Sequence, residues 1–299
     1  MPQHSILPAI GLRLLSVVMF AGMNVLTKLA EARGAALGEL LFFRQFGAAV
    51  LVGTVITIGP GIGSLRTLRV GAHVLRTAIG LTAMALTFST LLLLPLAEAT
   101  TIGFSMPIFA TVLGALILHE PTGWRRWAAV LAGFAGVVIV TQPGSGHIAL
   151  AGVLTGLGAA FCTASVSILL RTIGRTEPAL TTVFWFSALS LLPLGAVYLT
   201  VARAHDPLTW ATLLGIGVVG GLGQMAMTAS LVRGAVSLVV PMDYTALLWA
   251  TLFGGLVFGT LPTSATWAGA PIIVASGLYI VWREHRHRRS ETETANPQE

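Results

Sequence analysis

Long apolar runs, separated by short polar or charged segments, make up almost the whole chain. An α-helix needs about 20 predominantly apolar residues to cross the hydrocarbon core of a bilayer. Runs of about this length lie near residues 8–30, 38–59, 71–94, 99–118, 124–141, 149–171, 177–201, 209–231, 236–258 and 264–283. The pattern predicts an all-α integral membrane protein with ten transmembrane helices.

The composition strengthens this prediction. Of the 299 residues, 55% are hydrophobic and 9% are charged, and the mean hydropathy is +0.86. An ordinary soluble domain carries about 25% charged residues. The longest connection between spans, GPGIGSLRTLR, is too short for a soluble catalytic or nucleotide-binding domain. We therefore expect the function to lie among the helices.

The net charge of +6 comes from basic residues at the ends of the runs, so we expect no nucleic-acid partner. With ten spans, only Lys28, Arg33 and Arg203 fall on the side opposite to the termini, and Arg44 lies inside a span. Thirteen arginines fall on the side of the termini, namely Arg13, Arg66, Arg69, Arg76, Arg125, Arg126, Arg171, Arg175, Arg233, Arg283, Arg286, Arg288 and Arg289. The positive-inside rule then places both termini in the cytoplasm. We expect a multi-pass protein of a bacterial-type inner membrane.

The motif AEA at residues 30–32 has the small-residue spacing of a signal-peptidase site. The run before it is longer than the apolar core of a signal peptide, and it contains Arg13, Asn24 and Lys28. We therefore expect this first span to stay in the protein.

The chain matches itself at an offset of 140 residues. IFATVLGALILHEP (108–121) then aligns with LWATLFGGLVFGTL (248–261), and Trp127-Ala128 aligns with Trp267-Ala268. A constant offset over two helices indicates a duplication. The predicted units are a first five-helix repeat at 1–141, a linker at 142–148, a second repeat at 149–283 and a disordered cytoplasmic tail at 284–299.

Five spans per repeat is an odd number, so the second repeat must enter the membrane in the opposite sense. The two repeats are therefore predicted to be inverted relative to each other. Many secondary transporters have this architecture, with a substrate site near the midplane and halves that rock to give alternating access.

Two stretches resemble the EamA-type branch of the drug/metabolite transporter superfamily. They are GELLFFRQF (38–46) and LPLAEATTIGFSMPIFATVLGALILHEPTGWRRWAAVLAGFAGVVIVTQPG (94–144). The resemblance rests on Glu39 and Arg44, on the helix with Pro107, on Glu120 and on the closing GVVIVTQPG. The E-x-x-x-x-R and LPLAEAT motifs are more similar to the S-adenosylmethionine and riboflavin transporter group than to the aromatic amino-acid exporters. The second repeat departs from the pattern, since Thr260 replaces Glu120 and Trp185 or Phe186 replaces Arg44.

Ionisable groups inside a bilayer are costly, so each is a candidate for the substrate site. Arg44 lies about 7.5 Å deeper than Glu39 and about 140° around the helix, so the two are not expected to pair. Arg44 suits a substrate carboxylate or phosphate, or alternatively fixes the helix to a carbonyl or an acid. Glu39 contacts substrate or is a charge favoured at the helix start. Asn24 lies in the same half of the membrane and shares a helix face with Lys28.

In the second repeat, VVPMDYTALLW (239–249) places Asp243 two residues after Pro241, where we expect a broken helix. Its carboxylate binds a proton, a cation or the positive part of a substrate, or else it forms a fixed salt bridge or is a charge at a helix start. At the repeat offset of 140 residues, the segment Asp243-Tyr244-Thr245 aligns with Gly103-Phe104-Ser105. We therefore expect Tyr244, Phe104 and Ser105 near a common centre.

Two further candidates are less specific. Gln224, a mid-membrane amide in the glycine-rich run GIGVVGGLGQMAM, either binds substrate or bridges helices. Trp185 offers a flat ring for a substrate, or packs against lipid or the core.

Three classes of function compete for such a chain. We expect a secondary transporter of a small polar or zwitterionic metabolite, similar to S-adenosylmethionine, a vitamin or an amino acid, with an amino-acid or drug efflux carrier as the alternative. H-E-x-x-H and G-x-S-x-G are absent, which disfavours an enzyme, and no P-loop indicates ATP use. The unrepeated polar groups disfavour a channel. We expect no cofactor, no catalytic residue and no metal, since Cys162 is the single cysteine and a basic stop explains His285 and His287. The sequence does not determine the direction of transport, whether transport is coupled to protons or to exchange, or whether the protein forms a homodimer.

Overall fold

The computed structural model describes residues 6–117, 123–142, 148–173, 176–233 and 240–295. All regular secondary structure in these ranges is helical. The elements are α1 (Ile6–Ala32), α2 (Leu37–Ile58), η1 (Ile62–Leu65), α3 (Val70–Leu93), α4 (Leu96–Gly103), α5 (Met106–Ile117), α6 (Trp124–Thr141), α7 (Leu150–Ile173), α8 (Ala179–Val201), α9 (Pro207–Arg233), η2 (Val240–Thr245), α11 (Ala246–Phe258) and α12 (Ser264–Ala295). Glu120 and linker residues 143–147 lie outside the described ranges, as do the side chains of His285 and His287.

Among the described residues, seven helices are long and apolar enough to cross a membrane. One of the seven, Leu96–Leu116, joins α4 to α5. Three shorter apolar helices occupy the remaining predicted spans, at Trp127–Thr141, Met242–Phe258 and Ser264–Ile280. The prediction of an all-α protein made of membrane-length apolar helices is therefore confirmed.

Two of the spans are broken near their middle or start, and one of these breaks lies at Pro241, where the sequence predicts it. The α4 helix ends at Gly103, and α5 begins at Met106 after a turn at Phe104 and Ser105. Pro107 is then the second residue of α5, where a missing N–H costs no helical hydrogen bond. In the other broken span, the short 3-10 helix η2 contains Pro241 and Asp243 and precedes α11.

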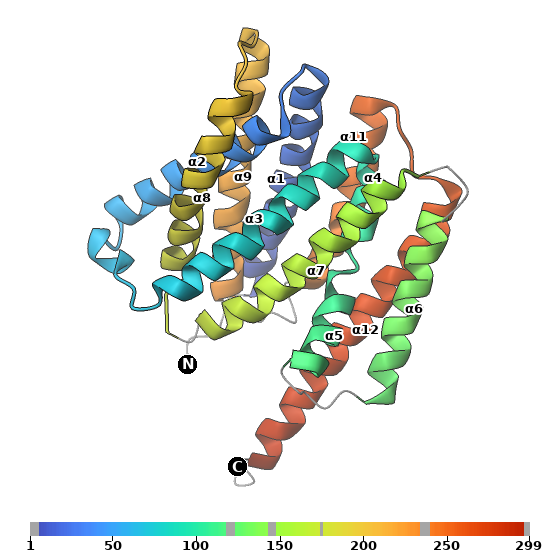
Figure 1. The fold of residues 1–299 in the computed structure, drawn as a ribbon. Helices are drawn as coiled ribbons and strands as arrows, with labels where there is room; N and C mark the ends of the chain where they lie inside the picture. Colours follow the sequence, from blue (N-terminus) through green and yellow to red (C-terminus); the bar gives the residue numbers. More distant parts are fainter. Residues whose placement is uncertain (1–5, 118–122, 143–147, 174–175, 234–239, 296–299) are drawn as a thin grey trace.

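Helices from the two predicted repeats interleave (Figure 1). The α1 helix packs along α9, and α3 packs along α7. The α2 helix contacts α8 and α9, α4 contacts α11, and α6 lies beside α12. The contact surface between the repeats therefore runs through the centre of the molecule.

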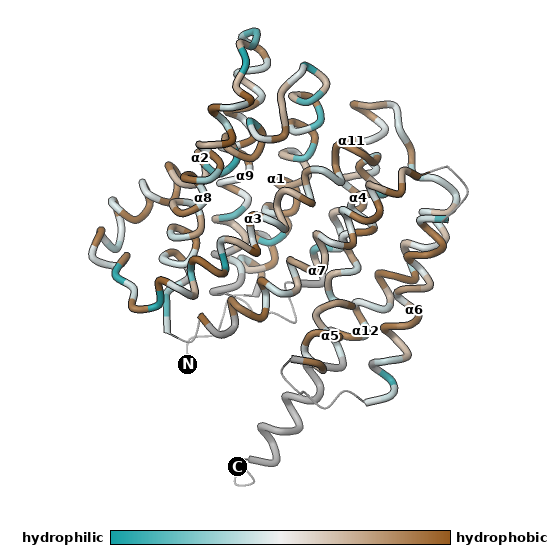
Figure 2. The backbone as a smooth tube through the Cα atoms, in the orientation of Figure 1, coloured by the Kyte–Doolittle hydropathy of each residue, from teal (hydrophilic) through white to brown (hydrophobic). Residues whose placement is uncertain are grey.

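Large apolar side chains also cover much of the exterior. Examples are Leu192, Leu199 and Leu248, each of which is exposed. Figure 2 shows apolar residues along the lengths of the helices and hydrophilic residues mainly at helix ends and in loops. An exterior of this kind suits contact with lipid acyl chains, since it would be unfavourable in water.

The last helix differs from the expected pattern. The α12 helix continues to Ala295, where the sequence predicts a disordered tail from residue 284. The added segment is rich in Arg and Glu, which favour helix in the absence of a glycine or proline to end it.

Glycines allow α2 and α9 to approach closely. A Cβ atom built on Gly47 would lie 2.4 Å from the Cα of Gly217, and one on Gly217 would lie 2.5 Å from the carbonyl oxygen of Phe43. Neither backbone can yield without moving its helix. Gly217 and Gly221 form a Gly-xxx-Gly pattern in α9, a spacing that lets helix backbones approach closely.

We expect Gly47→Ala to lower the free energy of unfolding by about 1–3 kcal/mol, because the added methyl group overpacks this crossing. The matched control is Gly53→Ala in the same helix, where an added Cβ meets no atom within 4 Å. The control should be neutral or slightly stabilising, since alanine favours helix over glycine. Thermal unfolding in detergent measures both, and equal effects would contradict the close crossing.

Candidate functional site

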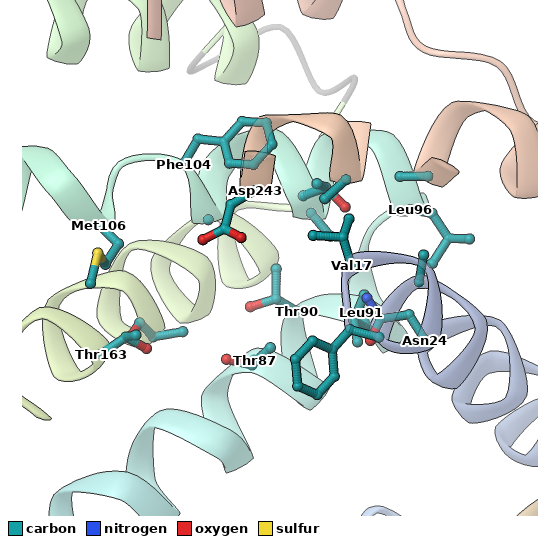
Figure 3. Close-up of a pocket in the computed structure, with 18 of the residues that line it drawn as sticks. Val17, Asn24, Thr87, Thr90, Leu91, Leu96, Phe104, Met106, Thr163 and Asp243 are labelled. Atoms are coloured by element: carbon teal, nitrogen blue, oxygen red, sulfur yellow. The ribbon is translucent and has the colours of Figure 1, made fainter. Parts of the chain in front are cut away.

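A cavity of about 340 Å³ lies between the two predicted repeats (Figure 3). The first repeat lines it with α1, α3, α4 and the start of α5, and the second with α7, α9, η2 and α11. Its volume lies within the range of small-molecule pockets, about 300–1,000 Å³. Most of its surface is apolar, with a few polar groups from different helices.

An ion pair between Arg13 of α1 and Asp243 of η2 lies at this cavity. Arg13 Nε donates to Asp243 Oδ1 at 2.6 Å, and Arg13 Nη2 donates to Asp243 Oδ2. The Arg13 side chain is 9% exposed and that of Asp243 is 39% exposed. Figure 3 shows the Asp243 carboxylate pointing toward the middle of the ring of lining side chains. The bidentate pair thus joins the two repeats while Asp243 stays accessible from the cavity.

The break in the ninth span explains why Asp243 can reach the cavity. It lies in the tight η2 turn after Pro241, before the regular helix α11 begins. Broken helices are tolerated at membrane depth only where they are buried in protein or line a cavity. Asp243 therefore forms a salt bridge, which is one of the alternatives expected from the sequence, and its partner is Arg13.

Threonine hydroxyls add hydrogen-bond acceptors to the cavity wall. Thr87 and Thr163 donate to the carbonyl oxygens of Ala83 and Ala159 in their own helices. Each hydroxyl hydrogen is used in this bond, so the oxygen lone pairs remain for a ligand donor. Two hydroxyl acceptors, one carboxylate and one guanidinium suit a polar or zwitterionic molecule.

Three of the predicted site residues line the cavity, namely Asn24, Phe104 and Asp243. Tyr244 and Ser105 lie just behind them. The Tyr244 ring packs edge-on against the Phe104 ring at 4.9 Å between centroids, and buried Ser105 donates to the carbonyl oxygen of Ile102. The expected clustering of the two break segments is therefore found, although only part of each faces the cavity.

The Glu39 carboxylate accepts hydrogen bonds at the start of α2. One carboxylate oxygen accepts from the backbone N–H of Ala36 at 2.8 Å, and the other from that of Arg203 at 3.2 Å. The His205 Nε2 atom lies 2.9 Å from the second oxygen. Glu39 thus fixes the start of α2 to the segment before α9, which matches the helix-start alternative, and it does not pair with Arg44.

Arg44 and Gln224 meet outside the cavity wall. Arg44 Nη1 donates to Gln45 Oε1, and Arg44 Nη2 donates to Gln224 Oε1 at 3.4 Å. Among the described residues, no carboxylate lies within ion-pair distance of Arg44. The expected alternative of a fixed acid partner is therefore not found in this part of the chain.

Trp185 lies at the end of the molecule where α3 and α8 begin. Its Nε1 donates to the carbonyl oxygen of Leu65 at 3.0 Å, and its ring stacks on His73. Close by, Thr67 Oγ1 donates to Glu177 Oε1 at 2.6 Å, and His73 Nε2 lies 3.7 Å from Glu177 Oε2. Trp185 therefore packs against a loop and does not line the cavity.

Sequence reasoning missed several functional candidates. Arg13 and Arg76 each lie a few residues inside a predicted span, but both were counted among the charges that orient the chain. The rule that an ionisable group within a span marks a site would have found both. The threonines of the cavity carry no comparable signal, because threonine also satisfies its hydroxyl within a helix at purely structural positions.

The family model for "EamA-like transporter family" matches residues 7–142 and 150–282. These matches cover most of the chain. The chain belongs to the EamA-like transporter family. It is therefore a membrane transporter, as the resemblance of its motifs implies.

Relatives with assigned transport functions extend over most of this EamA-like transporter. It is 29% identical to a riboflavin transporter of Vibrio cholerae over 76% of each chain. It is 27% identical to a riboflavin transporter of Rhizobium johnstonii, over 96% of this chain and 95% of the relative. It is 26% identical to an S-adenosylmethionine uptake transporter of Rickettsia conorii, over 96% of this chain and 97% of the relative.

A solved crystal structure has the same fold as this EamA-like transporter. The TM-score is 0.58 at 21% sequence identity, and the match covers 91% of this chain and 98% of the other. The similarity concerns the arrangement of the helices.

Proposed function

We propose that this EamA-like transporter is a secondary transporter that carries a small polar or zwitterionic metabolite across the inner membrane by alternating access. Riboflavin and S-adenosylmethionine, the substrates in the names of its relatives, are the first candidates. The observation that carries the proposal is the cavity between the repeats, whose wall includes the Arg13–Asp243 pair.

The proposal includes an inverted repeat of ten spans with both termini in the cytoplasm. Exchanging the repeats maps α1 on α7 and α3 on α9, so an α1–α9 contact requires an α3–α7 contact, and both occur. The same exchange maps α2 on α8 and α6 on α12, which are packed in pairs. The charge bias of the loops supports the orientation.

Two contacts between the repeats support alternating closure at opposite ends of the bundle. The first, which we call the α2–α9 latch, is formed by Glu39 and His205. The second, the α3–α8 latch, is formed by His73 and Glu177. Exchange of the repeats maps the start of α2 on the start of α8 and the start of α9 on the start of α3, so each latch corresponds to the other.

Reconstitution into liposomes tests the proposed function. We expect labelled riboflavin or S-adenosylmethionine to enter by counterflow against the same unlabelled compound, since alternating access exchanges solute without net flux. Parallel assays with and without a pH gradient separate proton coupling from exchange. Intact, correctly folded protein that moves neither compound, nor any of a panel of amino acids and vitamins, would overturn the proposal.

A further inference from the structure

Two buried arginines from different helices lie near each other, outside the cavity described above. Arg44 of α2 and Arg76 of α3 are each 8% exposed. The α2 and α3 helices contact each other, so both positive charges belong to the same buried region and repel each other. The residues around them come from α2, α3, α8 and α9; α2 contacts the other three helices, and α3 also contacts α8.

The donors of this cluster are only partly used. The Arg76 guanidinium lies over the ring of Phe186, 3.6 Å from its centroid. Its Nε and Nη1 atoms are buried without a hydrogen-bond partner in the described part of the chain, and the same holds for Nε2 of Gln45. A guanidinium stacked on a ring directs its N–H groups outward from the edge of the guanidinium plane. These edges are therefore available to an acceptor.

Within the described residues, four carboxylates near the helix ends and the cavity are bound to other groups. Asp243 pairs with Arg13, and Glu39 is held by the segment before α9. Glu98 accepts from Thr263 and Thr266, and Glu177 accepts from Thr67. The glutamines that surround Arg44 are neutral and leave the positive charge uncancelled.

Two like charges in a buried, apolar region are strongly unfavourable without an anion. Arginine does not escape this cost by losing its proton, because its pKa is too high. A bound anion would therefore satisfy the unpaired N–H donors and would also compensate the positive charge of the two arginines. An oxyanion supplies several acceptor oxygens together with negative charge, and planar guanidinium groups fit carboxylates and phosphates.

We propose that Arg44 and Arg76 form an anion-binding site, separate from the cavity, for a carboxylate or phosphate group of a small solute. Gln45 supplies an additional amide donor, and Gln224 orients Arg44. Gln224 lies three residues before Met227, which lines the cavity, so the site adjoins the cavity along one face of α9. The site requires no assumption about the transported substrate.

Thermal unfolding of the full-length protein in detergent tests the site. The midpoint is measured against increasing sodium phosphate or sodium acetate, at constant ionic strength set with sodium chloride. A ligand that binds the native state alone raises the midpoint with its concentration. We expect such a rise with at least one probe; a rise with acetate alone assigns a carboxylate, and a rise with phosphate alone assigns a phosphate.

Two variants and a matched control locate the effect. Arg76→Gln and Arg44→Gln should weaken the apparent affinity for the probe about tenfold to a hundredfold, as expected for losing a charged hydrogen bond. Arg33→Gln, which removes an exposed arginine at the far end of α1, should leave the rise unchanged. At low anion concentration, Arg76→Gln should be at least as stable as the wild type, because it relieves repulsion.

The outcomes that overturn the proposal are equally specific. The site is absent if the wild-type midpoint responds to neither probe, or if Arg76→Gln responds as the wild type does. A structural role for Arg76 predicts a variant that is less stable at every anion concentration. If the glutamine variants do not fold, Arg76→Lys replaces them, and the wild-type titration alone still decides whether an anion binds.

Discussion

Asp243→Asn is expected to abolish transport and to lower the free energy of unfolding by about 3–5 kcal/mol. The substitution removes the counter-charge of Arg13, whose side chain is 9% exposed and whose Nη1 is already buried without a partner among the described residues. Breaking a buried ion pair by removing one member leaves an uncompensated charge, which accounts for the size of the effect. Counterflow in liposomes and thermal unfolding in detergent measure the two losses.

The double variant Arg13→Gln/Asp243→Asn separates stability from binding. Replacing both charges by neutral groups removes the uncompensated arginine, so we expect stability to return to within about 1–2 kcal/mol of the wild type. Transport should stay lost, because the charges that would hold a zwitterion are gone. Wild-type transport by the double variant would show that the pair is only structural.

The exposed ion pair between Arg33 and Asp206, at 3.6 Å, offers the control. An exposed pair contributes little to stability, because water screens its charges. Arg33→Gln should therefore change neither stability nor transport appreciably. A large effect of this control would mean that the assay responds to any loss of positive charge.

Glu39→Gln and Glu177→Gln are expected to open opposite ends of the transporter. Each removes the negative charge of one latch and keeps an oxygen to accept from the neighbouring donor. A charged hydrogen bond contributes about 1.5–3 kcal/mol. The shift in the equilibrium between conformations is thus about tenfold to a hundredfold. Because the α2–α9 latch is closed at 2.9 Å and the α3–α8 contact measures 3.7 Å, Glu39→Gln should have the larger effect.

Cysteine labelling from either side of the membrane measures this shift. Replacing the single native cysteine by Cys162→Ala and adding Thr87→Cys places one thiol in the cavity wall. A membrane-impermeant maleimide should label it faster from the α2–α9 end in Glu39→Gln, and faster from the α3–α8 end in Glu177→Gln. Faster labelling from the same side in both variants, or no change in either, would contradict the latches.

The sequence predicted the membrane-length apolar helices, the family and the position of the helix break at Pro241. These features are local, because span length, a proline and a motif are each read within one segment. It also predicted correctly that Glu39 and Arg44 do not pair, since five residues on a helix separate two faces. The predicted inversion of the repeats remains a proposal.

The tertiary structure alone decided which candidates line the cavity. It joined Arg13 to Asp243 across 230 positions, buried Arg44 and Arg76 on two helices that contact each other, and placed Trp185 and Glu39 at opposite ends of the bundle. A helix in a bilayer can be apolar on every face, because lipid and protein interior are alike in polarity. The hydrophobic pattern therefore defined where each helix lies along the chain, while packing between helices set which face of each helix turns inward.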